Sequence, residues 1–134
     1  MDYDKIKPDP TVLKKHGVSL VLLFGSAVTG NRRQDSDVDI GVLFKNPELA
    51  AKNPVEVYGD LQAEFARRFK NQKLDIVYFH EAPLSLQFKA MNDGVVLYQS
   101  LPAEFADFKE KIMREYFDFK FFEDIFNAPL VSAV

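Results

Sequence analysis

The chain has 134 residues, of which 47% are hydrophobic and 28% charged, the balance of a single globular domain. Its net charge of -3 argues against broad, sequence-independent binding to nucleic acid, so no direct nucleic-acid binding is expected. The absence of cysteine excludes disulfides, zinc–thiolate sites and cysteine nucleophiles. The N-terminus has no apolar signal core, and no apolar run reaches the roughly 18 residues of a membrane span, so we expect a cytoplasmic protein with no membrane partner.

The first half of the chain predicts a short helix and two strands. In chain order we expect a helix over 9–16, a strand over 18–24, a turn over 25–35 with room for one helical turn, and a strand over 38–44. The first strand is an apolar run bounded by Gly17 and Gly25, which is typical of a buried strand. Gly17 also suits the position that ends the preceding helix. The pair Asn46-Pro47 interrupts the second strand.

The second half of the chain predicts helices that alternate with strands. We expect a helix from 53, a strand over 73–79, a short helix over 83–93, a strand over 95–98 and a last helix over 102–126. Asn53 and Pro54 suit a helix start. Apolar residues then recur every four positions, at Val57, Leu61, Phe65 and Phe69. The order predicts one α/β (α+β) domain over residues 1–134, a single mixed sheet of about four strands with helices packed on it.

Polar groups flank the turn between the first two expected strands. A glycine at position 25 lets the backbone approach a ligand, and exposed amides with the Ser26 hydroxyl suit phosphate oxygens. Asp37 and Asp39 occupy alternate strand positions, so both carboxylates lie on one face. At about 4 Å they repel by about 4 kcal/mol at an effective dielectric of 20, a penalty that magnesium and phosphate relieve. Such an acidic pair alone is typical of a polar loop; with the Gly-Ser turn it predicts a nucleoside triphosphate site.

A third carboxylate, Asp75, interrupts the apolar strand expected over 73–79. Burying a lone carboxylate is costly, so this side chain is expected to face a site or an edge of the sheet. If its strand lies beside that of the aspartate pair, three carboxylates converge. The alternative is an exposed edge position or a salt bridge to Lys73 or Arg67.

The segment Gly25-Ser26, ten residues and then Asp37-Val38-Asp39 resembles the signature of the DNA polymerase β-like nucleotidyltransferase superfamily. Its context, FGSAVTGNRRQDSDVDIGVLF, looks like that of the minimal nucleotidyltransferase (MNT) group. The resemblance covers most of the chain and implies the nucleotidyltransferase fold.

The resemblance also implies roles for individual residues. It implies that Gly25 and Ser26 bind the triphosphate of ATP. It implies that Asp37 and Asp39 bind both of two Mg²⁺ ions. Asp75 is then implied to complete one metal site and to help deprotonate the acceptor hydroxyl.

Neighbouring residues of the turn are less typical of that group. Many relatives carry a bulky or basic residue after the Gly-Ser pair, where this chain has Ala27 and Val28. Arg32 and Arg33 are candidates to neutralise triphosphate charge, and a solvated loop pair is the alternative. The two histidines, at 16 and 80, stand at the ends of expected elements and predict structural roles.

The resemblance implies a partner as well. MNT proteins of this size are often antitoxins encoded beside a HEPN-domain ribonuclease, and the implied reaction transfers AMP from ATP to a tyrosine of that toxin. Two other functions stay open. One is transfer to a small-molecule acceptor such as an aminoglycoside, for which 134 residues leave little room. The other is a non-catalytic antitoxin that neutralises its partner by binding.

The last expected helix, over 102–126, carries aromatic residues on more than one face. They are Tyr116, Phe117, Phe119, Phe121, Phe122 and Phe126. Such a helix must be buried on several sides, which predicts an interface with a partner or with a second copy of the chain. The alternative is a tail that folds back over the core.

Overall fold

The computed structural model describes residues 3–30 and 37–127, without the side chains at 121, 122 and 125–127. The elements are η1 (Tyr3–Ile6), α1 (Pro10–Lys15), β1 (Val18–Phe24), α2 (Ser26–Thr29), β2 (Val38–Phe44), α3 (Pro47–Lys52), α4 (Pro54–Arg68), β3 (Leu74–Tyr78), η2 (Phe79–Glu81), α5 (Leu84–Asp93), β4 (Val95–Gln99) and α6 (Glu104–Asn127). They form an α/β fold with a single four-stranded sheet, as the sequence predicts.

The sheet has the strand order β3-β2-β1-β4 and is mixed. β1 pairs antiparallel with both β2 and β4, whereas β2 and β3 run parallel. The parallel pair is joined through α3 and α4, as a crossover requires. Because β2 and β3 run the same way, their first residues meet at one end of the sheet.

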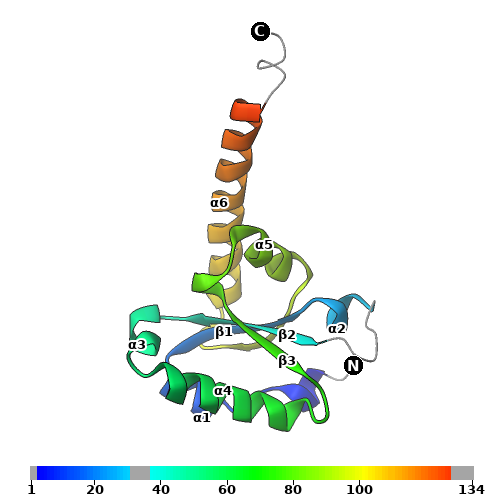
Figure 1. The fold of residues 1–134 in the computed structure, drawn as a ribbon, viewed down its shortest axis with the longest axis vertical. Helices are drawn as coiled ribbons and strands as arrows, with labels where there is room; N and C mark the ends of the chain where they lie inside the picture. The colour runs from blue at the N-terminus through cyan, green and yellow to red at the C-terminus, as the bar shows by residue number, and fades with distance from the viewer. Residues whose placement is uncertain (1–2, 31–36, 128–134) are drawn as a thin grey trace.

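Helices cover both faces of the sheet, with α1 and α4 on one side and α5 with the start of α6 on the other (Figure 1). β1 is buried along its whole length because alternate residues enter two separate cores. The first core includes Leu13, Val21, Leu23, Val38, Ile40, Val42, Leu61 and Phe65. The second includes Leu20, Leu22, Phe24, Phe79, Ala90, Met91, Phe108 and Ile112.

Most predicted element positions are confirmed, and three local details are corrected. The break at Asn46-Pro47 is also the start of α3, which the sequence analysis did not predict. The Asn46 side chain caps that helix by accepting a hydrogen bond from the Glu48 amide at 3.1 Å, whereas Asn53 begins α4 without a side-chain cap. The strand expected over 73–79 is shorter at both ends, because Phe79 begins a 3-10 turn and its ring enters the second core.

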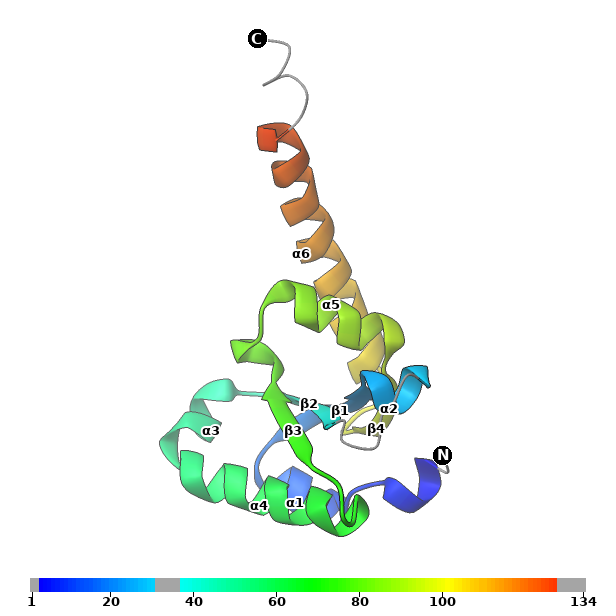
Figure 2. The ribbon, with the colours of Figure 1, turned by 45° about the vertical axis from the view of Figure 1, so that its right-hand side comes forward.

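The last helix divides into two parts. Near its start, Phe108 and Ile112 are buried against the second core. Beyond them α6 extends past α5 and away from the sheet, as a second view shows (Figure 2). Phe117 and Phe119, in that outer part, are 57% and 60% exposed. None of the described helices combines the length and apolar character needed to cross a membrane.

Candidate active site

The turn after β1 requires a glycine. Gly25 is buried and has a φ of +76°, a conformation that L side chains rarely adopt. A Cβ at this position would overlap the Oδ2 atom of Asp39. The Gly25 carbonyl accepts hydrogen bonds from the Val28 and Thr29 amides at 3.0 and 3.1 Å, which starts the short helix α2 at Ser26. The glycine therefore lets this turn lie directly against the carboxylate.

The aspartate pair lies where the alternation of β2 predicts. Val38 and Ile40 are buried in the first core, so Asp37 and Asp39 belong to the opposite face. Asp39 is half-buried and stands opposite Phe24, the last residue of β1, while Asp37 is exposed just before the strand begins. The Gly-Ser turn and both aspartates thus meet at one end of the sheet.

Asp75 lies beside the aspartate pair. In the parallel pairing of β2 with β3, the Cα partner of Asp39 is Asp75. Partners in a parallel ladder project from the same face, so the two carboxylates are neighbours. β3 is an edge strand and Asp75 is exposed, so the predicted edge position is confirmed, while its role in a site stays a prediction. Arg67, a candidate salt-bridge partner in the sequence, instead pairs with Glu64.

The electrostatics of these residues favour the uptake of positive charge. Burial raises the pKa of Asp39, and the nearby charges of Asp75 and Asp37 raise it further. The Asp39 and Asp75 carboxyl groups are close enough for a hydrogen bond between them to act in the same direction. The positive charge of Lys89, on α5, acts against these effects and lowers that pKa. A proton or a divalent cation relieves this repulsion.

The donor set fits magnesium, which prefers oxygen ligands and usually takes one or two carboxylates together with substrate phosphates. Asp37, Asp39 and Asp75 supply such oxygens near the Gly25-Ser26 turn. Across 3–30 and 37–127, however, no three aspartate, glutamate, histidine or cysteine side chains are grouped closely enough to hold a metal ion by themselves. The three-carboxylate metal site therefore stays a prediction.

Other residues singled out in the sequence have different places. Ala27 and Val28 pack against the first core, which explains why small or apolar side chains occur there. His16 Nε2 donates a 2.7 Å hydrogen bond to the Asp60 carboxylate, and the His80 ring stacks on Tyr78, so both have structural contacts. Arg32 and Arg33 lie outside the described residues, as do the side chains of Phe121, Phe122 and Phe126.

Lys89, whose charge lowers the pKa of Asp39, carries no signal in the sequence. It is exposed on α5. No local motif surrounds it, and its place near Asp39 depends on how α5 packs on the sheet. The sequence could indicate this position of Lys89 only if the packing of α5 on the sheet were already known.

Comparisons with known proteins agree with this geometry. Residues 7–102 match the family of polymerase beta nucleotidyltransferases, which is more than half of the chain. A protein adenylyltransferase, MntA, from Aphanizomenon flos-aquae (strain 2012/KM1/D3) is 28% identical over 102 residues, covering 72% of this chain and 67% of that protein.

Two solved structures have the same fold. A crystal structure of a toxin–antitoxin complex with AMP-PNP contains a chain that superimposes with a TM-score of 0.66 at 21% identity, covering 98% of this chain and 99% of that chain. A structure of a tri-AMPylated Shewanella oneidensis HEPN toxin in complex with an MNT antitoxin matches with a TM-score of 0.59 at 20% identity, covering 96% of this chain and 95% of that chain.

Proposed function

Because this chain belongs to the polymerase beta nucleotidyltransferase family, we propose that it transfers AMP from ATP to a hydroxyl group of a protein partner. The observation that supports the proposal most directly is that Gly25, Asp39 and Asp75 lie next to one another in the fold. The glycine turn touches the Asp39 carboxylate, and Asp39 stands in register with Asp75. Carboxylates next to an open backbone turn suit a metal-bound triphosphate.

Magnesium, when bound, supplies charge neutralisation at the attacking and leaving oxygens of an in-line phosphoryl displacement. Asp37 and Asp39 are the residues proposed to hold two such ions, with Asp75 completing one of the sites. The Gly25-Ser26 turn orients the triphosphate through backbone amides and the Ser26 hydroxyl. The close approach of Gly25 to the Asp39 carboxylate supports this assignment.

In the proposed reaction, the acceptor oxygen attacks the α-phosphorus of ATP. The new bond joins that oxygen to the α-phosphorus, while the bond from the α-phosphorus to the bridging oxygen of the β-phosphate breaks. Pyrophosphate leaves with that oxygen, and the acceptor proton passes to Asp75. Asp75 suits this role because it is exposed at the sheet edge, where an acceptor from a second protein can reach it.

The proposed acceptor is a tyrosine of a HEPN-domain toxin, which would make this chain its antitoxin. The proposal draws on the adenylyltransferase relative and on the fold shared with an antitoxin bound to an AMPylated HEPN toxin. A direct test incubates the protein with α-labelled ATP, magnesium and a HEPN protein encoded beside it. Label on a tyrosine of the HEPN protein supports the proposal. Complete absence of label under conditions where both proteins are folded contradicts it.

We also propose that the outer part of α6 is the surface that binds the partner. Phe117 and Phe119 are mostly exposed on different faces of the helix, and Met113, one turn before Phe117, is 43% exposed. A hollow of about 240 Å³ opens beside Phe119, lined by Pro83, Leu84, Ser85, Tyr116 and Phe119. Large exposed apolar side chains typically mark a protein interface.

Paired variants separate the catalytic role from simple binding. Asp39→Asn is expected to abolish AMP transfer while keeping the complex, whereas Phe117→Ser with Phe119→Ser is expected to weaken the complex. If Asp39→Asn still neutralises the partner fully at low expression, neutralisation by binding alone explains the antitoxin role. Transfer of label to an aminoglycoside, but not to the HEPN protein, would favour the small-molecule alternative.

A further inference from the structure

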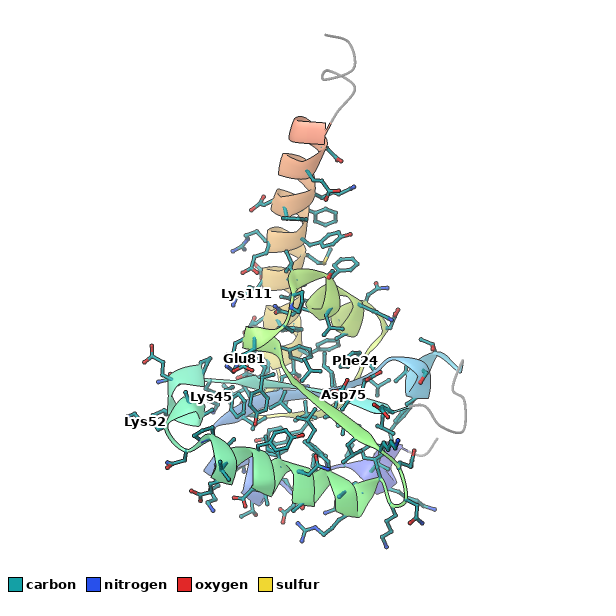
Figure 3. All side chains as sticks on the ribbon, in the orientation of Figure 1. Phe24, Lys45, Lys52, Asp75, Glu81 and Lys111 are labelled. Atoms are coloured by element: carbon teal, nitrogen blue, oxygen red, sulfur yellow. The ribbon has the colours of Figure 1, made fainter. Side chains whose placement is uncertain are left out.

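A lysine-lined hollow lies at the end of the sheet opposite the Gly-Ser turn. It has a volume of about 470 Å³, and its described lining comes from the end of α1, the residues after β2, α3 and the start of α4. Phe24 stands at one end of β1, opposite Asp39, and Val18 stands at the other end. The seven residues of β1 separate the two ends by about 20 Å. Lys45, which lines the hollow, therefore lies far from Phe24 and Asp75 (Figure 3).

Backbone contacts and a helix cap hold the walls of this hollow. The Lys45 amide donates a 2.9 Å hydrogen bond to the Gly17 carbonyl, which ties the chain after β2 to the end of α1. The Asn46 side chain caps α3, and the Val57 amide donates to the Asn53 carbonyl at 3.0 Å at the start of α4. Because all of these residues line the hollow, its shape is formed before any ligand binds, as is usual for small-molecule sites.

Lysines dominate the charge of the lining. Among the described lining residues, Lys14, Lys15 and Lys45 are accompanied by one carboxylate, that of Glu56. The Lys15 Nζ atom lies 3.3 Å from an oxygen of Glu56 and 3.3 Å from an oxygen of Asp60, so its charge is balanced within the chain. Lys14 and Lys45 are exposed and form no ion pair within residues 3–30 and 37–127. Two ammonium groups are thus left without a counter-charge in a chain whose net charge is -3.

Apolar side chains form another part of the lining. They are those of Leu49, Ala50 and Val57. Ala50 and Val57 are buried, whereas Leu49 is 56% exposed. Asn46 adds a hydrogen-bond donor, because its Oδ1 atom caps α3 and its side-chain amide nitrogen stays available. Cations beside an apolar surface suit a ligand that has an anionic group on an apolar body.

We propose that this hollow binds a phosphate monoester of a small apolar or aromatic group. Such a monoester has about two negative charges at neutral pH, which matches the two unpaired ammonium groups of Lys14 and Lys45. Lysine binds phosphate as a point charge and needs no bidentate geometry. The apolar group packs against Leu49 and Val57. This site is separate from the proposed AMP transfer and does not depend on it.

Backbone amide NMR shifts in metal-free buffer test the site. The probe is phenyl phosphate, and its singly charged and uncharged analogues are benzoate and benzyl alcohol. Phenyl phosphate at millimolar concentration is expected to shift the amides of Gly17, Lys45 and Asn46 and to leave those of Gly25 and Asp39 unshifted. Benzoate should bind more weakly than phenyl phosphate, and benzyl alcohol more weakly still.

Variants of the lining separate its two parts. Lys14→Gln combined with Lys45→Gln is expected to weaken phenyl phosphate binding about tenfold, or about threefold for each exposed charge. Leu49→Ser should weaken the binding of phenyl phosphate and leave that of inorganic phosphate unchanged. Lys70→Gln is the matched control, because Lys70 is exposed, forms no ion pair among the described residues and lies beyond the other end of α4.

The control variant should bind phenyl phosphate as the unchanged protein does. The proposal is overturned if the amides of Gly17 and Lys45 do not shift, or if the shifts are confined to Gly25 and Asp39. Equal affinity of the double lysine variant and the unchanged protein overturns it as well, and so does equal affinity for phenyl phosphate and benzyl alcohol. AMP transfer is measured separately, so its failure would leave this test unaffected.

Discussion

Two acidic side chains on opposite faces of the sheet have opposite surroundings. Glu64, on α4, is fully buried and accepts hydrogen bonds from the Asp9 amide at 3.0 Å, from Arg68 at 2.8 Å and from Arg67. Burial alone would raise its pKa, but these hydrogen bonds outweigh burial and hold the pKa below its ordinary value. Asp39 is half-buried beside other carboxylates, and its pKa is raised.

The contrast separates an acid that stabilises the fold from one that we propose to bind a metal ion. Glu64 finds its positive partners within the chain and ties the start of α1 to α4. Asp39 faces like charges, a repulsion that a cation bound from outside the chain would relieve. Perturbed carboxylates of the second kind are typical of functional sites. Substitutions at the two positions should therefore have opposite consequences.

The largest expected effect is that of Asp39→Asn on AMP transfer. Loss of a carboxylate that holds magnesium is expected to lower the rate roughly a thousandfold, or about 4 kcal/mol of transition-state stabilisation. The free energy of unfolding should not fall, because the amide removes repulsion from Asp37 and Asp75. Initial rates of label transfer and urea unfolding measure the two quantities. A rate within tenfold of the unchanged protein would show that Asp39 does not hold the catalytic metal.

Glu64→Gln is expected to do the reverse. Removing the charge leaves Arg68 and Arg67 without a partner and should cost about 3 kcal/mol of unfolding free energy, as for other broken buried ion pairs. The rate per folded molecule should stay the same, because Glu64 lies on the other face of the sheet. Arg67→Gln is a milder comparison, since Arg67 is mostly exposed. A large loss of rate in folded Glu64→Gln would contradict the separation of roles.

A glycine pair tests the close approach of the turn to Asp39. Gly25→Ala places a Cβ against the Asp39 carboxylate, so both stability and ATP binding should fall. Gly17→Ala has a similar positive φ, +66°, but open space around the new Cβ. Each change should cost about 1–3 kcal/mol of stability from backbone strain. ATP affinity, measured by competition, should fall in Gly25→Ala alone; an equal fall in both would contradict a direct role for the turn.

Local patterns in the sequence predicted the strands that carry the site. The apolar run before Gly25 and the alternation from Val38 onward predict the limits of β1 and β2, and the structure confirms these limits. Burial on two faces leaves a strong apolar pattern in the sequence. The same alternation predicted that Asp37 and Asp39 share a face. Strand-end details were less accurate, since Phe79 leaves β3 to pack in the second core.

Local sequence patterns could not predict contacts between distant segments of the chain. The register of Asp39 with Asp75 depends on which strand β3 pairs with, so the sequence predicts it only on the condition that β2 and β3 are neighbours. The place of Lys89 depends on α5 docking beside Gly94, which no local periodicity encodes. Glu64 was not identified either, because a buried acid on an amphipathic helix looks like any other polar residue until its arginine partners and α1 are in place.

The smallest expected effect is on the pH dependence of stability. Because the folded pKa of Glu64 lies below the ordinary value of 4.5, its contribution to stability is present above that pH and is lost as pH falls through the folded pKa. The pH dependence expected from Asp39 is opposite, since a raised folded pKa gives a contribution to stability that is present at low pH and lost as pH rises through that pKa.

Urea unfolding in metal-free buffer between pH 7 and about pH 4 should therefore show two trends in stability. The stability gap between the unchanged protein and Glu64→Gln should narrow toward acid, while the advantage of Asp39→Asn should grow toward neutral pH. Parallel curves for all three proteins would mean that neither carboxyl group has a different pKa in the folded and unfolded states.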